Sequence, residues 1–316
     1  MYEIIVNPGS QSGNGLKLWE KIEVLFKKYG ADYRVHYTKC DDSDRELFVS
    51  LCDEYKEKSE SLHIVVMGGD GTVNVVLQYL PTFENIKLSV IPVGSGNDLV
   101  RDIDFKGNRA ARVKHLLENP IEKSVDIGVV HCENSKGDGA NMDQRFIVST
   151  GIGYDAAVCE EVMRSKIKNA LNKVGLGKLV YLVVALKQLA GLKYVTTELT
   201  LDGSDEKIKF DQFILLAAMN HRFEGGGFMF GPEAKSNDGL LEICAANGLK
   251  RMKILMIMAQ ATKGKHFANK GVEHYRVASY TLHSSEPLWV HTDGEIRTMA
   301  DTIRVETLKE VLRLVY

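Results

Sequence analysis

The chain has 316 residues, of which 44% are hydrophobic and 26% charged, and its formal net charge is −2. This composition excludes a generally disordered chain, and the near-neutral charge excludes a protein that binds nucleic acid over its whole surface. The five cysteines include no C-x-x-C pair, which excludes a disulfide scaffold and a cysteine-based zinc ribbon and favours a reducing cytoplasm.

The N-terminal residues predict a cytoplasmic protein. They run directly into an apolar, β-branched segment at 3–6 and lack the basic-then-apolar layout of a secretion signal. The longest clean apolar run, 179–186, is too short to cross a bilayer.

The first part of the chain alternates short β-branched runs with helical patterns, which predicts a parallel sheet covered on both faces. A capping box formed by Ser43 and Glu46 is expected to begin one of the helices. The other expected elements are strands at 3–6, 33–37, 62–67 and 87–92 and helices at about 13–29 and 72–80.

From about residue 123 the strand-like runs follow one another more closely, which predicts an antiparallel sandwich. We place a soft domain boundary near residue 127. The expected strands are 123–131, 145–150, 194–203, 207–219, 239–246, 274–283, 287–292 and 295–306, with helices near 154–190 and 249–262.

Three polar, glycine-rich turns follow strands of the first part: 7–13, 68–74 and 92–98. Glycines let the backbone approach an anion closely, and the helix N-terminus that follows offers unpaired N–H groups. At the carboxyl ends of parallel strands these turns would converge on one crevice, for which a nucleotide is the natural ligand. Asp70 would repel a phosphate, so we expect it to hold a cation or to orient a neighbour.

The second part contains three turns with acidic residues, at 125–128, 235–240 and 293–295. Asp-Gly is also a common hairpin signal, so each turn has a purely structural alternative. Asp293 and Glu295 lie on either side of a glycine, where they could hold a cation or pair a base with its orienting residue.

Two further glycine motifs are ambiguous. Residues 151–156 match G-x-G-x-x-A. No acidic residue follows about 20 positions later to bind a ribose, so the motif favours a turn that shapes the sandwich over a dinucleotide site. Gly225, Gly226 and Gly227 would allow either a close backbone approach or a loose loop.

Two long stretches contain no acidic residue, 162–197 with seven basic residues and 243–272 with six. Both interleave the basic residues with apolar ones. Basic amphipathic helices of this kind can lie on an anionic membrane, and the alternative is an ordinary solvated helix face.

Together these motifs resemble the diacylglycerol kinase catalytic-domain family, especially soluble bacterial lipid kinases, and they are similar to sphingosine and ceramide kinases. The Gly-Gly-Asp-Gly-Thr element alone is shared with NAD kinases, and the later motifs favour lipid kinases. The motifs that carry the resemblance are Asn7-Pro8, Gly69 to Thr72 with Asn74, Gly94 to Asp98 with Arg101, Asp126 with Gly128, 151–156, 225–227, Asp238-Gly239 and 293–295.

The resemblance implies an α/β N-terminal nucleotide-binding domain of the NAD kinase-like or diacylglycerol kinase-like type, plus a C-terminal antiparallel β-sandwich domain. The first would comprise residues 1–127 with a returning segment at about 303–316, and the second, which takes the lipid substrate, residues 128–302. Such an enzyme uses ATP and Mg²⁺ to phosphorylate a lipid hydroxyl, diacylglycerol giving phosphatidic acid.

The resemblance also implies roles for individual residues. Glu295 or Asp293 would be the general base, and the family pattern favours Glu295. Asp70, Asp98 and Asp126 would form an acidic network near the catalytic Mg²⁺, while Asp238 with Lys235 and Leu240 would bind a structural Mg²⁺. The residues expected to contact ATP are Asn7, Pro8, Gly9, Ser10, Thr38, Gly68, Gly69, Asp70, Gly71, Thr72, Val73, Asn74 and Ser95, where Ser95 replaces the usual threonine and keeps its hydroxyl.

Two other functions stay open at this point: a kinase of a soluble acceptor such as NAD, and a nucleotide- or membrane-binding module without catalysis. A lipid substrate would require transient association with the inner face of the membrane. An exposed sandwich edge could pair two chains in a homodimer.

Overall fold

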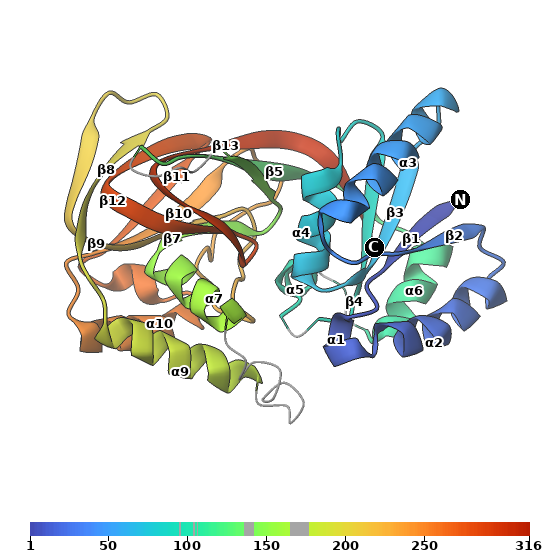
Figure 1. Cartoon of the computed structure of the whole chain (residues 1–316), viewed down its shortest axis with the longest axis horizontal. Coiled ribbons are helices and arrows are strands. Elements are labelled where there is room, and N and C mark those ends of the chain that lie inside the picture. The colour runs from blue at the N-terminus through green and yellow to red at the C-terminus, as the bar shows by residue number, and fades with distance from the viewer. Residues whose placement is uncertain (95, 104, 106, 136–141, 165–176) are drawn as a thin grey trace. The chain divides into compact units, whose positions relative to one another are not determined.

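The computed structural model describes residues 1–94, 96–103, 105, 107–135, 142–164 and 177–316 (Figure 1). The chain forms two compact units: unit 1 comprises Met1–Asp126 and Lys309–Tyr316, and unit 2 comprises Ile127–Leu308. Among the residues described, no helix is long and apolar enough to span a membrane.

Unit 1 is an α/β fold around a parallel sheet with strand order β4-β3-β1-β2. Apolar residues of β1, β3 and β4 pack against helices and are fully or almost fully buried. The elements are β1 (Tyr2–Val6), α1 (Ser10–Gly13), α2 (Gly15–Lys28), β2 (Tyr33–Tyr37), η1 (Asp42–Asp44), α3 (Arg45–Glu57), β3 (Leu62–Gly68), α4 (Asp70–Tyr79), β4 (Ile86–Pro92), α5 (Asp98–Asp102), α6 (Arg109–Glu118) and the start of β5 (Glu122–Glu133).

Unit 2 is an antiparallel assembly whose strands follow the order β11-β10-β9-β7-β12-β13, with β8 pairing with β12 and β9. The elements are β6 (Met142–Phe146), β7 (Ser149–Gly153), α7 (Tyr154–Arg164), α9 (Gly177–Ala190), β8 (Val195–Leu201), β9 (Lys207–Met219), β10 (Leu241–Asn247), α10 (Arg251–Ala261), η2 (His266–Ala268), β11 (Val272–Val277), β12 (Ser279–Thr292) and β13 (Glu295–Val315).

Strands β9 and β10 are apolar on both faces because each face contacts a separate core. Phe213, Leu216 and Ala218 of β9 pack in the core between the strand layers. Ile214, Leu215, Ala217 and Met219 belong to the second core, which α7, α9 and α10 cover. These strands are therefore continuously apolar, and they lack the alternation of apolar and polar residues that is typical of a strand with one solvent-exposed face.

The returning segment completes unit 1. Arg313 and Leu314 of β13 pair in parallel with Lys87 and Leu88 of β4. The carbonyl of Val315 accepts a hydrogen bond from Ser89 Oγ at 2.7 Å, and Tyr316 and Ile121 exchange backbone hydrogen bonds in both directions. The segment thus closes the β4 edge of the parallel sheet.

Three local expectations were wrong. Asp41, and not Ser43, accepts the first N–H of the turn that precedes α3. The segment 145–150 is two strands, β6 and β7, because the N–H groups at the break bond to a side chain and not to a neighbouring strand. The segments 274–283 and 287–292 divide at Ala278, so that the second lies wholly within β12.

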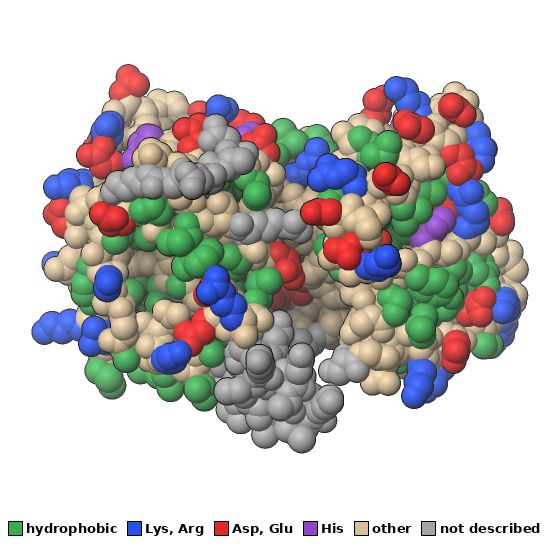
Figure 2. Space-filling model, in the orientation of Figure 1, with side chains coloured by type: hydrophobic (Ala, Val, Ile, Leu, Met, Phe, Trp, Pro, Cys, Tyr) green, Lys and Arg blue, Asp and Glu red, His purple; other side chains and the backbone are tan. Residues whose placement is uncertain are grey.

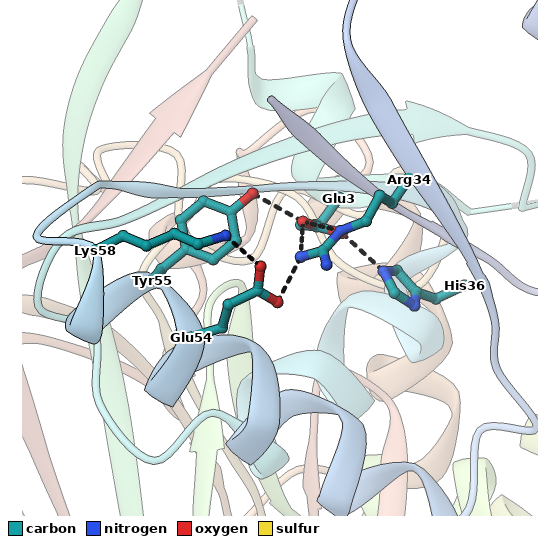
Figure 3. Close-up of polar contacts among 6 residues, drawn as sticks. All are labelled: Glu3, Arg34, His36, Glu54, Tyr55 and Lys58. Atoms are coloured by element: carbon teal, nitrogen blue, oxygen red, sulfur yellow. Dashed lines mark hydrogen bonds and ion pairs between the residues drawn. The ribbon is translucent and has the colours of Figure 1, made fainter.

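A buried ionic network lies on the face of β1 and β2 that α3 covers (Figure 3). Glu3 is 0% exposed, and its carboxylate accepts hydrogen bonds from Arg34, His36 and Tyr55. Burial alone would raise the pKa of Glu3, but these hydrogen bonds outweigh it and lower the pKa to about 2. Glu3 therefore stabilises the fold in its ionised form.

We predict that Glu3→Gln lowers the free energy of unfolding by about 3 kcal/mol at pH 7. Because the folded-state pKa is about 2 and the ordinary value is 4.5, this stabilisation is complete above about pH 5 and is lost as the pH falls from 4.5 to 2. Urea unfolding at several pH values measures the difference.

The matched control is Glu54→Gln, which alters the partly exposed carboxylate of the same network. It should lower the free energy of unfolding by less than about 1 kcal/mol. If the free energies of unfolding of wild type and Glu3→Gln differ by the same amount from pH 7 to pH 3, the lowered pKa assigned to Glu3 is wrong.

Candidate active site

The glycine-rich turns of unit 1 lie at the carboxyl ends of three adjacent strands, β1, β3 and β4. Asn7, which follows β1, donates a hydrogen bond from Nδ2 to Thr72 Oγ1 at 3.0 Å, and its Oδ1 accepts the N–H of Gly9 at 2.8 Å. The amide of Val93 bonds to the carbonyl of Gly68 at 3.0 Å. The turns therefore meet at one edge of the sheet.

The turns after β3 and β4 touch through their backbones at Gly69 and Gly94. A Cβ atom at Gly94 would lie 2.7 Å from Gly69 Cα, and one at Gly69 would lie 3.0 Å from Gly94 Cα. At Gly68, a Cβ would lie 2.4 Å from that of Thr72. Glycine is needed at Gly68 and Gly94, because these contacts are closer than a Cβ atom permits, and a Cβ at Gly69 would be at the limit.

Asp70 orients the neighbouring turn. Its carboxylate accepts the N–H groups of Asp98 at 3.0 Å and of Leu99 at 3.4 Å, which are the first residues of α5. A Cβ at Gly96 would lie 3.1 Å from Asp70 Oδ2 and 3.5 Å from Asp98 Oδ2, so both oxygens approach the same residue. Two carboxylates that converge in this way suit a hard divalent cation such as Mg²⁺.

Thr38 lies after β2 and is held by Asp44. Its hydroxyl donates to the Asp44 carboxylate and accepts the N–H of Cys40 at 2.9 Å. Cys40 Sγ lies 3.9 Å from Thr72 Oγ1, which links this turn to the one after β3. Thr38 is almost fully buried, and its hydroxyl helps to shape the turn. Its contact with ATP stays a prediction.

The remaining residues expected to contact ATP differ in what they expose. The side chains of Val73 and Asn74 are buried inside α4, and Asn74 Oδ1 accepts a hydrogen bond from Gln78. Ser10 Oγ donates to the carbonyl of Asn7, and Ser95 lies outside the described residues. Pro8 and Gly71 are partly exposed and Gly9 is exposed at the same turns.

In unit 2, Asp293 and Gly294 form the two-residue turn between β12 and β13, with positive φ at both residues (51° and 82°). The Asp293 carboxylate accepts the N–H groups of Ile147, Val148 and Ser149 at 2.8–3.1 Å. Asp293 thus anchors the turn to β7. Glu295, the first residue of β13, is half-buried.

In the loop expected to bind a structural Mg²⁺, Asp238 pairs with an arginine. Asp238 Oδ2 lies 2.6 Å from Arg276 Nη2 of β11, and Oδ1 accepts the N–H of Leu240 at 3.0 Å. The Mg²⁺ role of Asp238 with Lys235 and Leu240 stays a prediction. Arg276 gave no signal in the sequence, because a single arginine in a strand resembles any exposed cation.

Asp126 is fully buried, and its Oδ1 accepts the N–H of Glu310 at 2.7 Å. It therefore ties the returning segment to the end of unit 1. Sequence reasoning missed one buried group. His291 lies between the carboxylates of Asp155 and Glu224, and the only signal for it was Asp155 in the 151–156 motif.

Comparison with known protein families agrees with this architecture. Residues 2–130 match the diacylglycerol kinase catalytic domain, and residues 147–316 match the YegS C-terminal NAD kinase beta sandwich-like domain. The chain is 27% identical over 294 residues to the "Putative lipid kinase YtlR" of Bacillus subtilis, covering 92% of each chain. It is 25% identical over 295 residues to the diacylglycerol kinase of the same species, covering 92% of this chain and 88% of the other.

Solved structures share the fold. A diacylglycerol kinase from Bacillus anthracis superposes with a TM-score of 0.69 and 21% identity, covering 100% of this chain and 96% of the other. Yeast NADH kinase complexed with NADH gives a TM-score of 0.53 and 8% identity, covering 100% and 82%. The predicted fold class is confirmed, and the chain belongs to the lipid kinase family that joins a diacylglycerol kinase catalytic domain to a YegS C-terminal NAD kinase beta sandwich-like domain.

Proposed function

We propose that the protein is an ATP- and Mg²⁺-dependent lipid kinase that transfers the γ-phosphoryl group to a lipid hydroxyl, with diacylglycerol as the acceptor and phosphatidic acid as the product. The observation that carries the proposal is the convergence of the turns after β1, β3 and β4, where Asn7 bonds to Thr72 and Gly69 touches Gly94. Relatives named diacylglycerol kinase support the choice of acceptor.

The turns of unit 1 supply what a polyphosphate requires. The N-terminus of α4 begins at Asp70, immediately after Gly69, so the positive end of the helix dipole would face a bound phosphate. Asn7 and Thr72 would orient the nucleotide beside it. When bound, Mg²⁺ would neutralise phosphate charge, and Asp70 and Asp98 are the residues that would hold it.

Glu295 is the general base in this proposal. Asp293 accepts three backbone N–H groups, so most of its lone pairs hold the turn, and Glu295 is the first residue of β13. As the lipid oxygen attacks the γ-phosphorus, its proton passes to Glu295, and the bond to ADP breaks.

The α9 and α10 helices are proposed to contact the membrane that carries the substrate. Met252 and Met256 of α10 are 77% and 48% exposed, and Val183 of α9 is 63% exposed. Figure 2 shows hydrophobic and basic side chains mixed along the edge of unit 2 that these helices form. Lys166, Lys168 and Lys173, which the sequence also suggested for this contact, lie outside the described residues.

The test of the proposed function is phosphate transfer from labelled ATP–Mg²⁺ to diacylglycerol, phosphatidylglycerol, ceramide and sphingosine in mixed micelles, with NAD as the soluble control. We expect label in diacylglycerol. Label in NAD alone would make the protein a kinase of a soluble acceptor, and ATP binding without any labelled product would make it a non-catalytic module.

In the same assay, Glu295→Gln should lower kcat by a factor of about 10² to 10⁴ and leave the unfolding temperature unchanged. Asp293→Asn tolerates the positive φ but loses part of the hydrogen bonding, so we expect its unfolding temperature to fall by about 4–8 °C. Activity that survives in Glu295→Gln and disappears in a stably folded Asp293→Asn would reverse the two roles.

Gly94→Ala should weaken ATP binding at least tenfold, because the new Cβ would lie 2.7 Å from Gly69 Cα and force the two turns apart. Calorimetric titration with ATP–Mg²⁺ measures the effect. Gly191→Ala is the control, since the nearest atom to its Cβ would be 3.8 Å away. Equal affinities in both variants would remove this contact from the nucleotide site.

Replacing Met252 and Met256 together by Asp should weaken co-sedimentation with phosphatidylglycerol-containing vesicles at least fivefold at low salt, without lowering the unfolding temperature. The matched control is Val24→Asp on α2 of unit 1, whose side chain is 61% exposed. Unchanged binding in the double variant would exclude α10 from the membrane contact.

A further inference from the structure

A buried cluster of ionisable groups lies inside unit 2. His291 of β12 is 0% exposed, and its Nε2 lies 2.8 Å from Asp155 Oδ2 of α7 and 2.9 Å from Glu224 Oε1 of the loop after β9. Two carboxylates thus face one ring nitrogen. None of these residues has a role in the phosphoryl transfer described above.

The other nitrogen of the same ring bonds to the turn that precedes Glu295. His291 Nδ1 accepts the N–H of Gly294 at 3.2 Å. Because Nδ1 is the acceptor, the neutral ring carries its proton on Nε2, where the two carboxylates can share it. The imidazole therefore joins a buried acidic pair to the backbone of the turn.

Two glycine motifs of the sequence make room for this cluster. A Cβ at Gly151 would lie 2.2 Å from His291 Nε2 and 2.3 Å from Asp155 Oδ2. Gly225, Gly226 and Gly227 all have positive φ, and Glu224 and Phe228 close the loop with hydrogen bonds of 2.8 and 2.9 Å. The second motif is therefore a tight turn that places Glu224, and not a loose loop.

The charges in the cluster favour one shared proton. Burial, and then the neighbouring Asp155, raise the pKa of Glu224 to about 7. Burial would also raise the pKa of Asp155, but His291 outweighs it, so this pKa is lowered. Burial lowers the pKa of His291, while Glu224 and Asp155 together raise it. A charged ring would carry a proton on Nδ1, where the N–H of Gly294 already points, so the geometry keeps Nδ1 unprotonated and leaves the second proton of the cluster on Glu224.

The other groups that face the cluster contribute little charge. Cys159 lies one turn after Asp155 on α7, and Cys244 of β10 has a pKa that burial raises far above neutral. Ser149 of β7 adds a buried hydroxyl. Near neutral pH, a protonated Glu224 beside an ionised Asp155 leaves Nδ1 free to accept from Gly294.

A metal ion is the competing explanation. Ligand atoms of Asp155, Cys159 and His291 lie within 4.8 Å of one another. However, a metal on Nε2 requires the ring proton on Nδ1, where the N–H of Gly294 already points. The ring orientation therefore favours a proton over a metal.

We propose that His291 is a positioning residue for the general base: it holds Gly294 through Nδ1 and so fixes the turn that carries Glu295, while Asp155 and Glu224 hold the ring through Nε2. This inference rests on the proposed function, in which Glu295 accepts the proton of the lipid hydroxyl. It assigns a role in the active site to the acid of the 151–156 motif and to the residue that precedes the triple glycine.

The decisive comparison is His291→Asn against His291→Gln. The Asn Oδ1 can replace Nδ1 as acceptor for Gly294 but leaves the buried carboxylates unpaired. The Gln amide can replace Nε2 as donor to the carboxylates but leaves Gly294 without an acceptor. We expect kcat of His291→Gln to be at least tenfold below that of His291→Asn, with an unchanged KM for ATP, although His291→Gln has the higher unfolding temperature. Activity losses that follow the unfolding temperatures would overturn the proposal.

A double variant separates this inference from the proposed function. If His291 acts only through Glu295, His291→Gln should cause no further loss in the Glu295→Gln background. A further loss there would overturn the positioning role. Full activity of Glu295→Gln alone would instead overturn the proposed base, whatever His291 does.

The metal content gives an independent readout. We expect no stoichiometric metal in the purified protein, because Nδ1 already accepts the N–H of Gly294. One equivalent of zinc that is lost in Asp155→Asn would overturn the proposal.

Discussion

The geometry of the candidate active site in unit 2 depends on one carboxylate that accepts three backbone N–H groups. Asp293 takes these hydrogen bonds from 147–149, and in doing so it ends one strand, begins another and fixes a hairpin turn in a left-handed conformation. Charge-assisted hydrogen bonds of this kind contribute about 1.5–3 kcal/mol each. Three of the roughly four acceptor positions of this carboxylate are thus used to hold the backbone of the turn.

The sequence predicted the elements of unit 1 well because their signals are local. Strand β3, for example, is an apolar run that ends at glycines, and α4 begins at the next polar residue. The sequence also singled out Asp70, Asp293 and Glu295 as candidate site residues, since they stand in short polar turns. The break between β6 and β7 could not be predicted, because the side chain that causes it lies about 145 positions later in the chain.

Long-range charge pairs limited the prediction of the site in the same way. Arg276 neutralises Asp238 across 38 positions, and His291 meets Asp155 across 136. Neither Arg276 nor His291 stands in a motif that distinguishes it from other residues of its strand. Whether an acid is a metal ligand, an anchor or a base depends on which cation or N–H group the fold brings to it, and that information appears only once the strands are paired.

The returning strand has a consequence for synthesis of the protein. Residues 1–126 of unit 1 are synthesised before unit 2, yet the sheet edge at β4 is closed by residues 313 and 314. Most domains fold as units in the order in which they are made, at about 5–20 residues per second. Here the contiguous unit 2 can complete its fold first, while unit 1 must wait until residues 313 and 314 have left the ribosome. Until then the nascent chain has to keep an open parallel edge from aggregating.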